Sequence, residues 1–286
     1  MVNSVRTDLA SEAHRLWRAS PEATSGLPGV RAGEEKILGF PVMAVEILDE
    51  EGAQALGKPP GRYYTMELPR VPGRGEEAFP DAVGALARLI RRCLPEREQG
   101  PFLVAALGNP DITPDSLGPL CAENVLVTRH LKARQPSLFH PFAPTAVCRT
   151  GVLGTSGMES ALQIRALCRS LFPCCVIAVD ALAGADADRL CRSVQVCNSG
   201  IAPGSGVGND REQLDARSLD VPVVAIGIPT VIDASFFSGD ESVRGLFVTP
   251  RGIDEQVRSG ARLIGYAINL ALHDGLTVDD VQALLS

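Results

Sequence analysis

The 286-residue sequence has few aromatic side chains and no excess of basic charge. Phe, Trp and Tyr make up 5% of the residues, too few for the stacking platforms that bind single-stranded nucleic acids. Lys and Arg total 27 against 34 Asp and Glu, which gives a formal net charge of −7 at pH 7. The chain therefore lacks the basic surface that nucleic acids and anionic membranes require, and neither is expected as a direct partner.

Long apolar segments are also missing. No run of about eighteen apolar residues occurs, so no membrane-spanning helix is expected. Residues 1–17 contain several charged side chains and no apolar core of signal-peptide length. These two observations predict a cytoplasmic protein.

The sequence contains no recognisable metal or cofactor motif. Its eight cysteines never occur as Cys-x-x-Cys, and Cys174 and Cys175 lie within an apolar run, so we expect buried, reduced thiols and no metal. Residues 52–59 resemble a phosphate-binding loop, but Pro59 stands where a Ser or Thr would hold magnesium, and the intervening residues are typical of a helix. No cofactor is therefore expected.

Short apolar runs alternate with segments of helical periodicity along most of the chain. Hydrophobic residues make up 45% of the sequence, which is enough for a large core. The apolar runs lie at 102–107, 174–179, 193–197 and 221–226, and the expected helices at 81–94, 157–171 and 253–273. This alternation predicts an α/β domain with a mostly parallel, buried sheet. Residues 36–75 are expected to add a β-hairpin.

Acidic residues follow two of the apolar runs. Asp115 lies shortly after residues 102–107, and Asp180 directly after residues 174–179. Ligands bind outside the carboxyl ends of parallel strands. Two carboxylates that face one cleft can share a proton, so that one acts as an acid while the other activates water for amide hydrolysis. The alternative is structural: Asp115 caps a helix that begins near Leu117, and Asp180 caps a turn.

A glycine-rich segment follows the run at residues 193–197. If all strands are parallel, Asn198 lies at the same sheet edge as the two aspartates. Glycines permit positive φ and close backbone approach, so the segment is expected to line a substrate groove or to turn tightly. A phosphate cradle is disfavoured, because no Lys-Ser/Thr follows. The candidate groove residues are Asn109, Asn198, Ser199, Gly204, Ser205 and Gly206.

Three long motifs are distributed along the chain. They are Thr-Pro-Asp-Ser-Leu-Gly-Pro at 113–119, Asn-Ser-Gly-Ile-Ala-Pro-Gly-Ser-Gly-Val-Gly-Asn at 198–209 and Val-Ala-Ile-Gly-Ile-Pro-Thr-Val-Ile-Asp at 224–233. Together with shorter matches, they resemble the germination protease (spore protease) family of endospore-forming bacteria nearly from end to end. One departure is that some members carry a longer segment between the Asp233 region and Val248.

The resemblance implies an endopeptidase of the spore core that degrades small acid-soluble spore proteins during germination. It implies an α/β/α sandwich similar to the hydrogenase-maturation peptidases, and a homotetramer. It also implies an unusual aspartic-type mechanism, whose two carboxylates map onto Asp115 and Asp180. A basic side chain near the groove is expected to pair with the acidic residue before the cleaved bond, and Arg211 and Arg149 are the candidates.

The segment Thr-Asp-Leu-Ala-Ser-Glu at 7–12 is similar to the acidic–apolar–Ala sequence at which these substrates are cleaved. Because the resemblance implies a zymogen, we expect self-cleavage between Asp8 and Leu9. Residues 1–8 would then be a propeptide that occupies the groove, and residues 9–286 a single peptidase domain. The alternative is that the N-terminal segment is a tail packed on the surface.

Two other functions remain open. One is a metal-dependent peptidase on the same scaffold, with the same aspartates as metal ligands. A groove of this kind is also compatible with a non-catalytic protein that holds an extended peptide.

Overall fold

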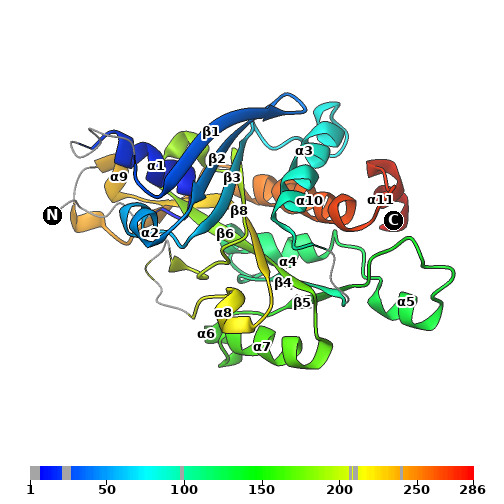
Figure 1. Ribbon diagram of the computed structural model, residues 1–286. Helices are drawn as coiled ribbons and strands as arrows, with labels where there is room; N and C mark the ends of the chain where they lie inside the picture. The colour runs from blue at the N-terminus through cyan, green and yellow to red at the C-terminus, as the bar shows by residue number, and fades with distance from the viewer. Residues whose placement is uncertain (1–6, 21–26, 97–99, 206–207, 209–211, 239–240) are drawn as a thin grey trace.

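Nine β-strands form one sheet in the computed structural model, which describes residues 7–20, 27–96, 100–205, 208, 212–238 and 241–286 (Figure 1). The order across the sheet is β1-β2-β3-β7-β8-β6-β4-β5, and β9 pairs with β8. The strands are β1 (Val30–Ile37), β2 (Phe40–Ile47), β3 (Gly61–Glu67), β4 (Phe102–Ala106), β5 (Thr145–Arg149), β6 (Cys175–Gly184), β7 (Ser193–Cys197), β8 (Val223–Asp233) and β9 (Phe247–Val248).

Strands β8, β6, β4 and β5 are parallel, and all but the edge strand β5 are largely buried. The apolar run at the start of β6 is buried on both faces, as expected for a central parallel strand. β4 ends at Ala106, opposite Val179, whereas β6 continues to Gly184 alongside β8. The predicted α/β class with a mostly parallel core is confirmed.

Strands β7, β3, β2 and β1 extend the sheet, and each neighbouring pair among them is antiparallel. β2 and β3 lie within residues 36–75, where the sequence predicts a hairpin. β1 is not indicated by the sequence pattern, because most of its side chains are exposed. It joins β2 through Leu38 and Gly39, whose φ angles of 48° and 87° suit a tight hairpin turn.

The direction of β7 corrects one expectation about the site. β7 is antiparallel to β8, with Cys197 opposite Ala225, so the chain leaves β7 near the amino-terminal end of β8. The expectation that Asn198 lies at the same sheet edge as Asp115 and Asp180 is therefore wrong. A five-residue strand with alternating side chains has the same pattern in either direction, and its sequence does not reveal the difference.

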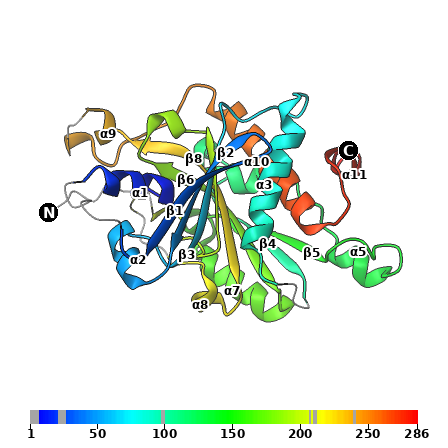
Figure 2. The same ribbon diagram turned by 45° about the horizontal axis from the view of Figure 1, so that its top comes forward.

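Helices cover both faces of the sheet and complete a three-layer sandwich (Figure 2). One face packs against α3 (Ala78–Cys93), α4 (Leu117–Ala122), α10 (Ile253–Leu272) and α11 (Val278–Leu284). The other packs against α1 (Ala10–Arg18), α2 (Glu50–Leu56), α7 (Ser160–Leu171) and α8 (Ala216–Leu219). Shorter helices are α5 (Arg129–Arg134), α6 (Leu153–Ser156) and α9 (Ser235–Ser238). Within the described residues, none of the helices combines the length and apolarity that a membrane span needs.

The cysteines are part of the core, as predicted. Seven are buried, Cys148 is half-buried, and all eight are free thiols. Burial raises the pKa of the Cys93 and Cys175 thiols to about 12, so both stay protonated at neutral pH. Their role is therefore packing.

Gly118 allows α4 to lie directly on the sheet beside the end of β4 and the middle of β6. A Cβ atom at this position would lie 2.2 Å from the Leu107 carbonyl oxygen and 2.6 Å from that of Val179. Both contacts are with backbone atoms, which cannot rotate away. The close approach of α4 fixes the position of the preceding turn, which carries Asp115.

We expect Gly118→Ala to lower the free energy of unfolding by about 3 kcal/mol, because the added methyl group forces α4 away from the sheet. Urea denaturation measures the change. Gly154→Ala is the matched control: its Cβ would have no atom within 4 Å, so it should be neutral or slightly stabilising. Equal unfolding midpoints for Gly118→Ala and the wild type would contradict this account of the packing.

Candidate active site

Asp115 and Asp180 line the same pocket, at the carboxyl ends of the parallel strands. The pocket has a volume of about 480 Å³. Asp8 from the N-terminal segment, Ser160 at the start of α7 and Gly204 contribute to its wall. The structure thus brings together both aspartates that the sequence singled out, and adds a third carboxylate.

Asp180 lies inside β6, at the level where the neighbouring β4 has ended. It is opposite Gly227 of β8, where a Cβ atom would approach the Asp180 carbonyl oxygen to 2.6 Å. The carboxylate is 4% exposed, and its Oδ1 accepts a hydrogen bond from the Ala181 N–H (2.9 Å). Because β6 continues to Gly184, Asp180 does not cap a turn.

Asp115 ends a short 3-10 turn, Thr113–Asp115, that precedes α4. Its Oδ2 accepts a hydrogen bond from the Asn109 N–H (2.8 Å). The N-cap position of α4 is Ser116, and the Ser116 side chain makes no capping hydrogen bond to that helix. The carboxylate thus binds the loop after β4, and the N-cap position of α4 belongs to the next residue.

Two residues shape the loop that holds Asp115. Gly108 has φ +106°, and a Cβ atom there would lie 2.0 Å from the Asp115 carbonyl oxygen, so the contact requires glycine. The Asn109 side chain accepts from the Asp111 N–H (3.0 Å) and stabilises the turn. Asn109 thus positions Asp115 through its backbone N–H.

The other candidate groove residues fall into three groups. Gly204 lines the aspartate pocket, and the Ser205 hydroxyl donates to Asp8 Oδ1 (2.9 Å). Asn198 instead accepts from the Arg62 N–H (2.8 Å) near the start of β3, and Ser199 lines a neighbouring pocket. Gly206 and Arg211 lie outside the described residues. The remaining basic candidate, Arg149, pairs with Glu123 at 3.3 Å.

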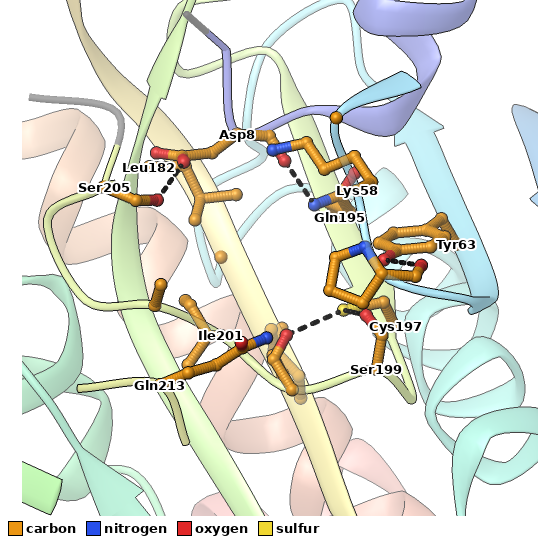
Figure 3. Close-up of a pocket in the computed structure, with 17 residues that line it drawn as sticks. Asp8, Lys58, Tyr63, Leu182, Gln195, Cys197, Ser199, Ile201, Ser205 and Gln213 are labelled. Atoms are coloured by element: carbon orange, nitrogen blue, oxygen red, sulfur yellow. Dashed lines mark hydrogen bonds between the residues drawn. The ribbon is translucent and has the colours of Figure 1, made fainter. Parts of the chain in front are cut away.

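A second pocket of about 260 Å³ adjoins the first (Figure 3). Asp8 and Leu182 line both pockets. In Figure 3, the Lys58 side chain extends toward Asp8, and the Gln195 amide donates to the Asp8 carbonyl oxygen (2.9 Å). Neither Lys58 nor Gln195 is indicated by a sequence motif of this site, because their place in the pocket depends on contacts between distant segments.

The N-terminal segment adds to the sheet where β4 no longer covers β6. The Asp8 N–H donates to the Ala183 carbonyl oxygen (2.9 Å), and the Ala183 N–H donates to Asp8 Oδ2 (2.8 Å). Leu9 and Ala10 are fully buried. From Thr7 onward the segment is thus built into the fold, which argues against a loose surface tail for this part.

A metal site needs several donor side chains that converge on one point. Across the part of the chain that the structure describes, no group of three or more His, Cys, Asp or Glu residues is arranged to hold a metal ion. His273, a typical ligand type, accepts from the Ala143 N–H through Nδ1 (3.2 Å) and lies away from the aspartate pocket.

Comparison with known proteins shows similarity along nearly the whole chain. The sequence profile of the family described as germination protease matches residues 7–243. The chain is 36% identical to the germination protease of Caldanaerobacter subterraneus subsp. tengcongensis, with 100% of this chain and 99% of the relative covered. It is 32% identical to that of Clostridium perfringens, with 99% of each covered. The germination protease of Bacillus cereus is 40% identical over 83% of this chain and 65% of its own length.

We expect Asp8→Ala to loosen the N-terminal segment from β6, because the Ala183 N–H and the Ser205 hydroxyl both lose an acceptor. Amide hydrogen exchange at Ala183 should become about fivefold faster, which corresponds to the loss of about 1 kcal/mol. Mass spectrometry of the peptide that contains Ala183 measures the rate. Asp111→Ala, in an exposed turn, is the control and should leave this rate unchanged; an unchanged rate in Asp8→Ala would contradict the docking.

Proposed function

The chain belongs to the germination protease family, and from this premise we propose that it is an endopeptidase that starts the degradation of small acid-soluble spore proteins during germination. It acts in the cytoplasm of the spore core, as a homotetramer, and cleaves after an acidic residue. The observation that carries the chemical part of the proposal is the convergence of Asp115 and Asp180 on one pocket.

The two carboxylates divide the chemistry of peptide hydrolysis. One is ionised and takes a proton from water as the water oxygen attacks the peptide carbonyl carbon. The other is protonated and donates its proton to the leaving nitrogen as the C–N bond breaks. Repulsion between two close negative charges favours such a singly protonated pair. The backbone N–H groups of Asn109 and Ala181 hold the carboxylates in place.

The contacts of Asp8 support cleavage after an acidic residue. Its carboxylate is held by the Ala183 N–H and the Ser205 hydroxyl beside the aspartate pocket. An aspartate or glutamate side chain of a substrate would use the same two donors. The candidate Arg211 is a further partner in this proposal, whereas Arg149 has Glu123 as its partner.

The N-terminal segment acts as a propeptide in this proposal. Asp8 lies between the aspartate pocket and the second pocket and lines both. Its removal would join them into one groove along the face of the sheet, long enough for an extended substrate. Occupation by residues up to Asp8 would therefore keep the precursor inactive.

We expect Asp115→Asn and Asp180→Asn each to lower the cleavage rate of a small acid-soluble spore protein by about a thousandfold, because neither amide can exchange the proton. Mass spectrometry of the products measures rate and cleavage position, and thermal melting checks folding. Asp111→Asn, in the exposed turn, is the control. Full activity of either active-site variant would refute the two-aspartate mechanism.

The same assay separates the alternatives. Activity that is lost in a chelator and restored by a divalent ion would select a metal-dependent peptidase. Binding of the substrate without turnover by the processed protein would select a non-catalytic function.

Processing is expected between Asp8 and Leu9. Incubation of the purified precursor should yield a chain whose first residue is Leu9, and the Asp115→Asn variant should remain full-length. N-terminal sequencing measures both. A mature chain that begins elsewhere would refute the processing site without affecting the assignment of the catalytic pair.

A further inference from the structure

The Glu12 carboxylate is buried in the fold directly beside the proposed processing site. The residue is 0% exposed. Its Oε2 accepts hydrogen bonds from the Thr7 hydroxyl and from the Ala185 N–H (2.7 Å). Its Oε1 is buried and has no hydrogen-bond partner among the described residues. A buried carboxylate oxygen without a donor is costly to the folded state.

Thr7 stands between Glu12 and the backbone nitrogen of Leu9. The Leu9 N–H donates to the Thr7 hydroxyl oxygen (3.1 Å), and that hydroxyl donates to Glu12. Leu9 is the N-cap residue of α1, and Glu12 is the third residue of that helix. An acidic side chain at this spacing characteristically reaches back to the N-cap nitrogen. Here the Thr7 side chain occupies that place.

Hydrolysis of the Asp8–Leu9 bond would change this arrangement. One water molecule is consumed, the main chain of Asp8 ends in a new α-carboxylate, and Leu9 gains an α-ammonium group. Thr7 leaves with residues 1–8, so Glu12 loses the hydroxyl donor. In the same step, the Leu9 nitrogen changes from a single N–H donor into a cation with three.

We propose that Glu12 is the counter-ion of the amino terminus that processing creates, and that the Leu9 α-ammonium takes the place of the Thr7 hydroxyl. The inference rests on the proposed cleavage between Asp8 and Leu9. The ion pair would hold the start of α1 to the end of β6, through the hydrogen bond from Ala185 to Glu12. It would keep the start of α1 docked on the sheet, where Ala10 packs against Val45 and Ala225, after the propeptide has left.

The other charges around Glu12 are already paired. Arg189, whose positive charge acts on Glu12, donates to the Ser11 hydroxyl (2.7 Å) and to the Glu67 carboxylate (2.6 Å). Asp186 pairs with Arg15 at 2.6 Å. Burial raises the pKa of the Glu12 carboxyl above its usual value, despite the donors from Thr7 and Ala185. An adjacent ammonium group would reverse this penalty, because opposite charges favour each other's ionised forms.

The test compares wild type and Glu12→Gln, each as precursor and as processed protein. At neutral pH, the Leu9 α-amine of processed wild type should react with an acylating reagent about tenfold more slowly than in the unfolded chain. In processed Glu12→Gln the protection should fall to threefold or less. Mass spectrometry of the N-terminal peptide measures these rates.

Thermal melting provides a second readout that a purely structural role would not produce. Glu12→Gln should lower the melting temperature of the processed form by about 5 °C, because it leaves a buried cation unpaired. It should not lower that of the precursor, where it removes an unfavourable buried charge. Glu34→Gln, exposed on β1, is the control and should change neither form.

A further variant separates this inference from the proposed processing. The residues before Leu9 are replaced by the recognition sequence of a site-specific endopeptidase that cuts directly before Leu9. A failure to self-process then counts against the proposed function alone. If the Leu9 amine of the processed wild type reacts as fast as in the unfolded chain, the proposed ion pair is wrong. This measurement needs only the wild-type chain, so it tests the proposal even if Glu12→Gln fails to fold. An equal loss of stability in both forms would overturn it as well.

Discussion

The parallel pairing of β6 with β8 is the interaction on which the rest of the site depends. The pairing extends from Val176 to Gly184, whereas the β4 strand on the other side of β6 stops opposite Val179. β6 is therefore paired with only one strand over its last residues, and its other edge is left to the N-terminal segment. Asp180 is the first residue of this half-open stretch. Its backbone is fixed by β8, and its side chain faces a pocket.

The open edge of β6 also explains where the N-terminal segment docks. The backbone groups of Ala183 would be unpaired after β4 ends, and unpaired buried backbone groups are costly. Asp8 satisfies the Ala183 carbonyl with its N–H and the Ala183 N–H with its side chain. The position of Asp180 in its pocket and the docking of the N-terminal segment thus arise from a single feature, the unequal lengths of two neighbouring strands.

The sequence was informative where burial leaves a strong pattern. The uninterrupted apolar runs predicted β4, β6 and β8, and because Asp115 and Asp180 follow two of these runs closely, their convergence was predictable. The direction of β7 was not, since a short alternating strand carries no sign of direction, and Asn198 was consequently misplaced. Glu12 was equally hidden, because an acidic residue early in an amphipathic helix is typical of a solvent-facing position. Gln195 finds its partner, Asp8, in the distant N-terminal segment. Glu12 in turn accepts a hydrogen bond from Ala185, which is equally distant in sequence.

The exposed character of β1 has a consequence for how copies of this chain can associate. A free edge strand offers unpaired backbone groups to any other strand, and charged side chains along it oppose such pairing. Arg31, Glu34 and Lys36 are exposed on β1, and Glu35 is tied to Arg92. Continuation of the sheet from one subunit into the next across β1 is therefore disfavoured. The charged side chains of β1 thus limit growth of the sheet at this edge.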